Sequence, residues 1–337
     1  MTKEVFLKKI IPAIFPLLML LNCSTQISKN GNETISLKQT IPLPNVTGRI
    51  DHLAFDGKKQ TVFIAALGNN SVEVVDLNNK KVIHSIKELH EPQGIVFIPQ
   101  SNSIFVANGE NGECDVFNAE TFQKTNSISL GDDADNVRYD SLDKKIYVGY
   151  GSGGIAIIDA HNFNILSQIK LTGHPESFQI DKTQKKMFVN VPGEKQIEVI
   201  DLVKDAVIAQ WKLTEARANF PMALDEKDNR LFVGCRHPSK LLVMDMQTGK
   251  TISSLDIDSD VDDIFYNSIS KEIYLSCGGG YVDVFKQDDA NHYSAIGKTE
   301  TLSGARTSLF TPGLNELLVA SPSSISRSAQ LLIYEIK

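Results

Sequence analysis

The stretch Ile146-Tyr147-Val148-Gly149 is a short apolar segment with an aromatic residue near its centre, and it recurs along the chain. The equivalent segments are Val62-Phe63-Ile64-Ala65, Ile104-Phe105-Val106-Ala107, Met187-Phe188-Val189-Asn190, Leu231-Phe232-Val233-Gly234, Ile273-Tyr274-Leu275-Ser276 and Leu317-Leu318-Val319-Ala320. Their central residues lie 41 to 44 positions apart, so the chain contains seven copies of one unit. A period of this length is typical of repeat architectures.

Each unit contains three further short segments that are rich in β-branched residues, which favour strands. One segment precedes the aromatic strand and ends in a turn-forming residue such as Asp56. Another follows it and usually ends in a carboxylate, as at Asp76, and the last segment comes directly after that. Four short strands in about 42 residues are the unit of a β-propeller blade. The sequence therefore predicts an all-β, seven-bladed β-propeller.

The seventh unit ends at Lys337 directly after its third strand, and so it lacks a fourth. Residues 34–43 resemble the fourth strand of the other units and precede the first inner strand. Pairing residues 34–43 with the last blade would close the ring and leave no open strand edge. We therefore expect one propeller domain over residues 34–337, closed by its N-terminal strand.

Residues 1–22 are typical of a secretory signal peptide, with lysines before an apolar stretch over residues 10–21. That stretch is shorter than the roughly 20 residues that a membrane-spanning helix needs, which disfavours a retained anchor. The sequence Leu20-Leu21-Asn22-Cys23 resembles a bacterial lipobox, although Gly, Ala or Ser is usual at the position of Asn22. The resemblance implies acylation of Cys23, for example by palmitate, and a tether over residues 23–33. It also implies export to the bacterial cell envelope, and the serine after Cys23 favours the outer membrane.

The aromatic-centred second strand and the Asp-ending third strand together resemble the repeat of the YVTN-type seven-bladed propellers, the YncE-like group. The resemblance extends over nearly all of residues 44–337, although the YVTN tetrapeptide itself is absent. WD40 repeats fit less well, because the units lack the Gly-His and Trp-Asp pairs. Membership of the YVTN group implies an exported propeller, and most such proteins have no assigned activity.

In a propeller, the innermost strands line a central channel, and the loops that enter them form a mouth where ligands usually bind. Aligning the inner strands places one residue of each blade at the same level: Asp51, Gln93, Asp135, Glu176, Phe220, Asp262 and Arg306. Asp133, Asp260 and Asp263 lie close by in the sequence. The candidate binding residues are Arg49, Asp51, His52, Glu91, Asp135, His174, Glu176, Arg217, Asp262 and Arg306. Such a mouth could hold a cation, or its arginines could pair with an anion. The same side chains could also simply solvate the opening.

Composition and cysteine spacing narrow the function classes. A formal net charge of −7 disfavours a nucleic-acid partner. The four cysteines, Cys23, Cys114, Cys235 and Cys277, show no metal-ligand spacing, and the last two are expected to be buried free thiols. No motif predicts a metal, a cofactor or catalytic residues.

We expect an envelope lipoprotein that binds an unknown small molecule, polymer or protein at the channel mouth and contacts the membrane through its lipid anchor. The alternative is a hydrolase of the lactone or sugar-acid type, similar to the seven-bladed phosphogluconolactonases. His174, Glu176, Arg217 and Arg306 are residue types that could polarise an ester and activate water. No local motif places these four residues in one geometry.

Overall fold

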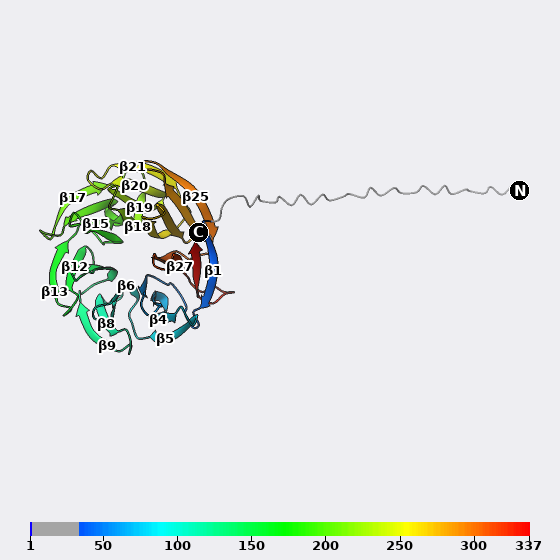
Figure 1. Ribbon diagram of the computed structural model, residues 1–337, viewed down its shortest axis with the longest axis horizontal. Helices are drawn as coiled ribbons and strands as arrows, with labels where there is room; N and C mark the ends of the chain where they lie inside the picture. Colours follow the sequence, from blue (N-terminus) through cyan, green and yellow to red (C-terminus); the bar gives the residue numbers. More distant parts are fainter. Residues whose placement is uncertain (2–33) are drawn as a thin grey trace. The chain divides into compact units, whose positions relative to one another are not determined.

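Seven four-stranded antiparallel sheets are arranged as the blades of a ring in the computed structural model (Figure 1). The structure describes Met1 and residues 34–337. The predicted signal peptide, Cys23 and the predicted tether lie outside the described residues. The prediction of an all-β, seven-bladed β-propeller is confirmed. Blade 1 contains β2 to β5, the following blades continue in chain order, and blade 7 contains β26 to β28 together with β1.

Each blade runs from an inner strand at the channel to an outer strand at the rim. The inner strands are β2 (Leu53–Asp56), β6 (Pro92–Ile98), β10 (Ala134–Asp140), β14 (Phe178–Asp181), β18 (Arg217–Asp225), β22 (Val261–Asn267) and β26 (Thr307–Thr311). The second strands are β3 (Thr61–Ala66), β7 (Ser103–Asn108), β11 (Lys145–Tyr150), β15 (Lys186–Val191), β19 (Arg230–His237), β23 (Glu272–Cys277) and β27 (Glu316–Ser321).

The third strands are β4 (Ser71–Asp76), β8 (Glu113–Asn118), β12 (Gly154–Asp159), β16 (Gln196–Asp201), β20 (Ser239–Asp245), β24 (Tyr281–Gln287) and β28 (Gln330–Ile336). The outer strands are β5 (Lys81–Ile86), β9 (Lys124–Ser129), β13 (Ile165–Lys170), β17 (Ala206–Lys212), β21 (Thr251–Asp256), β25 (Tyr293–Glu300) and β1 (Ile35–Pro42). Two short 3-10 helices, η1 (Leu67–Asn69) and η2 (Pro192–Glu194), connect second to third strands.

The recurring aspartates hold the tight turns that follow the strands. After the inner strand of blade 1, Asp56 Oδ1 accepts hydrogen bonds from the backbone N–H groups of Lys58 and Lys59. After the third strand of blade 3, Asp159 Oδ1 accepts the same pair of bonds from His161 and Asn162. A short side-chain acceptor satisfies backbone donors that the turn leaves unpaired, which explains why aspartate recurs at these positions.

The hydrophobic core lies between the blades. Each cluster of buried apolar side chains combines residues of two neighbouring blades, as where Phe63 of blade 1 packs with Ile95 and Val106 of blade 2. The aromatic residues that mark the repeat are the centres of these contacts, and Phe63, Tyr147 and Phe232 are at most 1% exposed. The repeat therefore reflects a side chain that every blade inserts against its neighbour.

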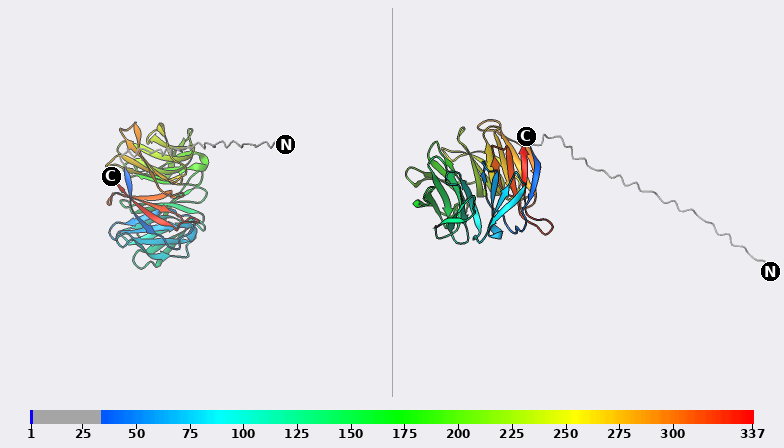
Figure 2. Two further views of the ribbon diagram at one scale, coloured as in Figure 1. Left: turned by 90° about the vertical axis from the view of Figure 1, so that its right-hand side faces the viewer. Right: turned by 60° about the horizontal axis from the view of Figure 1, so that its bottom comes forward.

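The N-terminal strand closes the ring. Strand β1 pairs antiparallel with β28, in a register that runs from Ile35 opposite Ile336 to Pro42 opposite Gln330. Figures 1 and 2 show β1 in blue beside the red C-terminal strand. Ile35, Ile41 and Leu43 are completely buried. The predicted closure of the last blade by residues 34–43 is thus confirmed.

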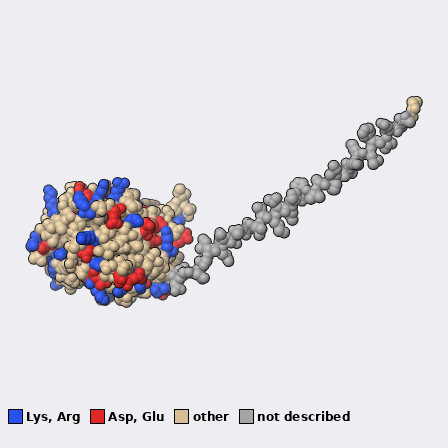
Figure 3. Space-filling view, turned by 90° about the horizontal axis from the view of Figure 1, so that it is seen from above, with Lys and Arg blue, Asp and Glu red and all other residues tan. Residues whose placement is uncertain are grey.

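One edge of the ring is mixed in charge. On the edge of the ring shown in Figure 3, Lys and Arg side chains are interspersed with Asp and Glu. Among Met1 and residues 34–337, no helix has the length and apolar character needed to cross a membrane.

The three cysteines in the described residues, Cys114, Cys235 and Cys277, are free and buried. The expectation of buried free thiols at Cys235 and Cys277 is therefore confirmed.

Candidate functional site

A polar cavity of about 340 Å³ occupies the mouth of the central channel. It is lined by Arg49, Asp51, His52, Gln93, Asp133, Asp135, Asn136, His174, Glu176, Ser177, Phe220, Arg236, Asp262 and Arg306. The set contains at least one residue from each inner strand or its entry loop, at the level that the repeat alignment predicted. The structure therefore brings together eight of the ten candidate residues.

Glu91 and Arg217 are the two candidates that do not line the cavity. Both are exposed, and Arg217 lies opposite His237 at the start of β18. The backbone is left-handed at Glu91 (φ 53°) and at Ala218 (φ 57°). A left-handed residue interrupts the strand alternation on which the repeat alignment depends, so side chains at or before it need not face the channel.

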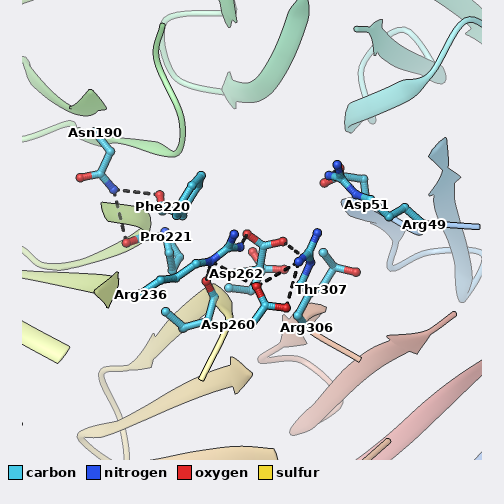
Figure 4. Close-up of polar contacts among 12 residues, drawn as sticks. Arg49, Asp51, Asn190, Phe220, Pro221, Arg236, Asp260, Asp262, Arg306 and Thr307 are labelled. Atoms are coloured by element: carbon cyan, nitrogen blue, oxygen red, sulfur yellow. Dashed lines mark hydrogen bonds and ion pairs between the residues drawn. The ribbon is translucent and has the colours of Figure 1, made fainter. Parts of the chain in front are cut away.

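Two arginines and two aspartates form a closed network on one side of the mouth (Figure 4). Arg306 contacts Asp260 Oδ2 through Nη1 at 2.9 Å and Asp262 Oδ2 through Nε at 2.9 Å. Arg236 pairs with the same two aspartates, and its guanidinium lies 3.9 Å from the centre of the Phe220 ring. Because each guanidinium has two carboxylate partners, the charges of Arg236 and Arg306 are already compensated within the network.

Arg236 is a site residue that the sequence analysis missed. It extends from β19, a second strand, whereas the alignment searched only the inner strands and their loops. The long arginine side chain reaches across to blade 6, where its Nε also donates to the carbonyl oxygen of Val261. The only signal in the sequence was a charged residue directly after the apolar run of this strand.

His52 lies between two carboxylates deeper in the channel. Its Nε2 is 3.7 Å from Asp51 Oδ1, and its Nδ1 is 3.8 Å from Asp263 Oδ1. Burial opposes protonation of His52, but the charges of Asp51 and Asp263 outweigh it and raise the histidine pKa. Burial also raises the pKa of Asp263 to about 7, although His52 and the backbone N–H of Ser308 act in the opposite direction.

Asp133, Asp135, His174 and Glu176 form the opposite side of the mouth. His174 Nδ1 is 2.7 Å from the carbonyl oxygen of Gly151, and its Nε2 is 3.7 Å from Asp135 Oδ2. The Asp135 carboxylate, opposed by burial, raises the pKa of His174 to about 9. Burial, together with the charge of Asp135, raises the pKa of Glu176 to about 8. This side of the mouth, here called the acidic wall, carries more negative charge than its cations balance.

A second cavity of about 330 Å³ lies further along the channel, and His52 and Ser177 line both cavities. Most of its lining is apolar and comes from the inner strands, but Arg138 and Asp263 also face it. The Arg138 guanidinium donates to Ser177 Oγ at 3.2 Å and to the carbonyl oxygen of Val137 at 2.8 Å. Burial lowers the pKa of Arg138. The sequence analysis did not identify this arginine as a channel residue.

Comparison with known proteins identifies the fold class. No protein-family model matches the chain, and no curated protein matches it. A chain in a solved structure of the Kuenenia stuttgartiensis hydrazine synthase is similar, with a TM-score of 0.75 and 16% identity over 87% of this chain and 98% of that one. A chain in the crystal structure of a mitotic checkpoint complex also has a TM-score of 0.75, with 13% identity over 98% of both chains. At these identities, the similarity establishes the seven-bladed propeller fold alone.

Proposed function

We propose that this protein is a lipid-anchored envelope propeller of the YVTN, YncE-like type, and that its channel mouth binds a small ligand bearing positive charge. The observation that carries the binding proposal is the charge balance of the cavity. Five carboxylates line it against three arginines and two histidines, and the closed network pairs Arg236 and Arg306 with Asp260 and Asp262. On the acidic wall, His174 is the single basic side chain beside Asp133, Asp135 and Glu176. The negative charge that is left is concentrated on the acidic wall.

The size of the cavity supports a small ligand over a polymer or a folded partner. Its volume of about 340 Å³ is near the lower end of the range for small-molecule sites, roughly 300–1,000 Å³. Asp135 in the acidic wall has a side chain that is only 10% exposed. A carboxylate so far withdrawn from water interacts strongly with a cation that enters the mouth.

We expect the polyamine spermidine to bind the full chain at pH 8, and Asp135→Asn to weaken that binding about tenfold. The reason is that one partly buried charge-assisted hydrogen bond contributes about 1.5–3 kcal/mol. Isothermal titration calorimetry with spermidine, and with citrate as an anionic probe, measures this. Asp289→Asn removes an exposed carboxylate far from the channel lining and should leave the affinity unchanged. Tight citrate binding, or spermidine binding that Asp135→Asn does not alter, would contradict the proposal.

The hydrolase alternative is supported by His174 and Glu176, which lie together in the cavity and have pKa values raised to about 9 and about 8. The positions of the two arginines that would polarise the ester count against hydrolysis. Arg217 lies outside the cavity lining, and Arg306 is held by Asp260 and Asp262. Turnover of a lactone by the parent protein, lost in Glu176→Gln, would favour hydrolysis over binding.

The lipid anchor is tested separately, because Cys23 lies outside the described residues. Cys23→Ala should abolish incorporation of labelled palmitate in the producing bacterium, since this residue would carry the acyl chains. Cys114→Ala, which removes a buried thiol of β8, is the matched control and should retain the label. Unchanged labelling of Cys23→Ala would refute lipidation at that site.

A further inference from the structure

We propose that Asp135, His174 and Glu176 form a binding site for a first-row divalent transition-metal ion, and that Zn²⁺ is the ion that this donor set fits best. The inference rests on the proposed function, because it specifies the cation that the acidic wall takes. One ligand atom from each of the three side chains lies within 4.8 Å of the other two. The sequence showed no ligand spacing, because Asp135 and His174 belong to the channel entries of different blades.

The backbone that carries these side chains is fixed on both blades. Asp135 lies in β10, while His174 and Glu176 lie in the segment that leads into β14. The backbone N–H of Glu176 donates to the carbonyl oxygen of Asn190 at 2.9 Å, which ties this segment to the second strand of its own blade. Pro175, between the two ligands, is buried. Asp135 is thus held on a strand, and His174 and Glu176 are held in the segment before β14 that is hydrogen-bonded to β15.

The hydrogen bond of His174 leaves the correct ring nitrogen free for a metal. A carbonyl oxygen can only accept, so the contact of 2.7 Å with Gly151 requires a proton on Nδ1. In the neutral ring, Nε2 then carries the lone pair, and Nε2 is the atom that faces Asp135. Metal-binding histidines almost always donate their second nitrogen in this way. Gly151 has a φ of 58°, a conformation that favours glycine, and it presents its carbonyl group to the imidazole.

The spacing between His174 and Asp135 suits a bridging ion better than a direct bond. The distance of 3.7 Å from Nε2 to Oδ2 is too long for a hydrogen bond. Two ligands bound tetrahedrally to zinc at about 2.0–2.2 Å lie about 3.4 Å apart, so these two atoms need to move very little. All three ligand atoms lie within 4.8 Å of one another, so no pair needs to close by more than about 1.4 Å, which side-chain rotation can supply.

Charge compensation also favours an ion at this position. Within residues 34–337, the ion-pair partner of Asp135 is His174, and Glu176 has no ion pair within 4.0 Å. Binding of the ion releases the protons of His174 and Glu176, and the two carboxylates with the neutral imidazole then carry a charge of −2, which a divalent ion balances. An imidazole ligand favours transition metals, whereas Mg²⁺ and Ca²⁺ prefer oxygen ligands alone. Three protein ligands leave a fourth position of zinc open toward the cavity.

The test is zinc binding to the full chain after dialysis against a chelator. We expect calorimetry and elemental analysis after desalting to show one tightly bound Zn²⁺ per chain. His174→Ala should weaken this binding by about 100-fold or more, because losing a direct ligand costs at least as much as losing its orienting partner. Asp135→Asn and Glu176→Gln preserve side-chain volume and should also lose at least tenfold each. His161→Ala, at an exposed turn after β12, is the matched control and should bind like the parent.

Absence of stoichiometric Zn²⁺ binding would overturn the metal site, as would binding that survives all three ligand substitutions. If spermidine binds and Zn²⁺ does not, the metal inference fails and the proposed function stands. If neither binds, both fail. Circular dichroism of each variant verifies that a lost ion does not reflect a lost fold, and His161→Ala shows whether surface histidines contribute.

Discussion

Deletion of residues 34–43 from the full chain lowers the unfolding temperature by about 10 °C or more, because it removes the outer strand of blade 7. Ile35, Ile41 and Leu43 are fully buried, and each buried aliphatic side chain of this kind contributes roughly 1.5–3 kcal/mol. The loss, about 5 kcal/mol or more, is comparable with the whole stability of many domains. Calorimetry or circular dichroism during heating measures the shift.

The deletion also uncovers the edge of β28, whose residues from Gln330 to Ile336 lose their pairing with β1. An unpaired strand edge invites pairing between chains, so we expect concentration-dependent association in light scattering. Deletion of residues 24–33, which are predicted to be a tether, is a control of equal length and should melt like the parent. A chain that lacks residues 34–43 and still melts like the parent would show that β1 is dispensable for the ring.

Asp263→Asn increases stability at pH 8 and does so by a smaller amount at pH 5. The folded state holds the pKa of Asp263 at about 7, above its ordinary value of about 3.9, because the carboxyl group is buried. Between these two values the folded chain keeps a proton that the unfolded chain has lost, so stability decreases as the pH rises through this range. Asparagine cannot ionise, and its amide oxygen can still accept the backbone N–H of Ser308, which donates to Asp263 at 2.7 Å.

His52 contributes to the same pH dependence with the same sign. Its pKa is raised in the folded state, so the stabilisation is complete below about pH 6.5 and is lost as the pH rises through the folded value. Removing the Asp263 charge takes away one of its two carboxylate partners and lowers that pKa. The free energy of unfolding of Asp263→Asn should therefore exceed that of the parent by an amount that grows from pH 5 to pH 8, to at most about 4 kcal/mol.

Denaturant unfolding of both proteins at pH 5, 6.5 and 8 measures this difference. Glu120→Gln changes an exposed carboxylate in the turn after β8 and should give a curve parallel to that of the parent. If Asp263→Asn is less stable than the parent at pH 8, the buried carboxylate stabilises the channel, and the reasoning from burial is wrong.

The repeat made the ring and the level of the mouth predictable from the sequence. The aromatic position of each unit, such as Tyr147, is buried between blades, and one wrong residue there would leave a cavity in the core. Because the units are equivalent, one alignment placed Asp51 and Asp135 at the same height in the channel. The height of a residue in the channel can therefore be predicted from its position in the repeat, even with a single sequence.

Pairing across the channel was not predictable in the same way. The contacts of Arg236 with Asp260 and Asp262 depend on how far a long side chain extends and on how two blades are inclined. The placement of Arg217 depends on a left-handed residue that follows it, and alanine at position 218 gives no sign of that conformation. The proximity of Asp135 to His174 likewise depends on the distance between neighbouring blades, which no spacing in the sequence encodes.

The pairing of Ile35 with Ile336 has a consequence for the order in which the chain folds. Strand β1 is made before the other strands of the domain and its partner β28 is the last of them, so β1 stays without its neighbour until the domain has been synthesised. Joining the two ends closes a loop that comprises almost the whole domain, which makes this a late and entropically costly contact. A nascent chain halted before Gln330 would therefore carry a finished set of middle blades and a free first strand, and its capture by chaperones should end only when the last strand arrives.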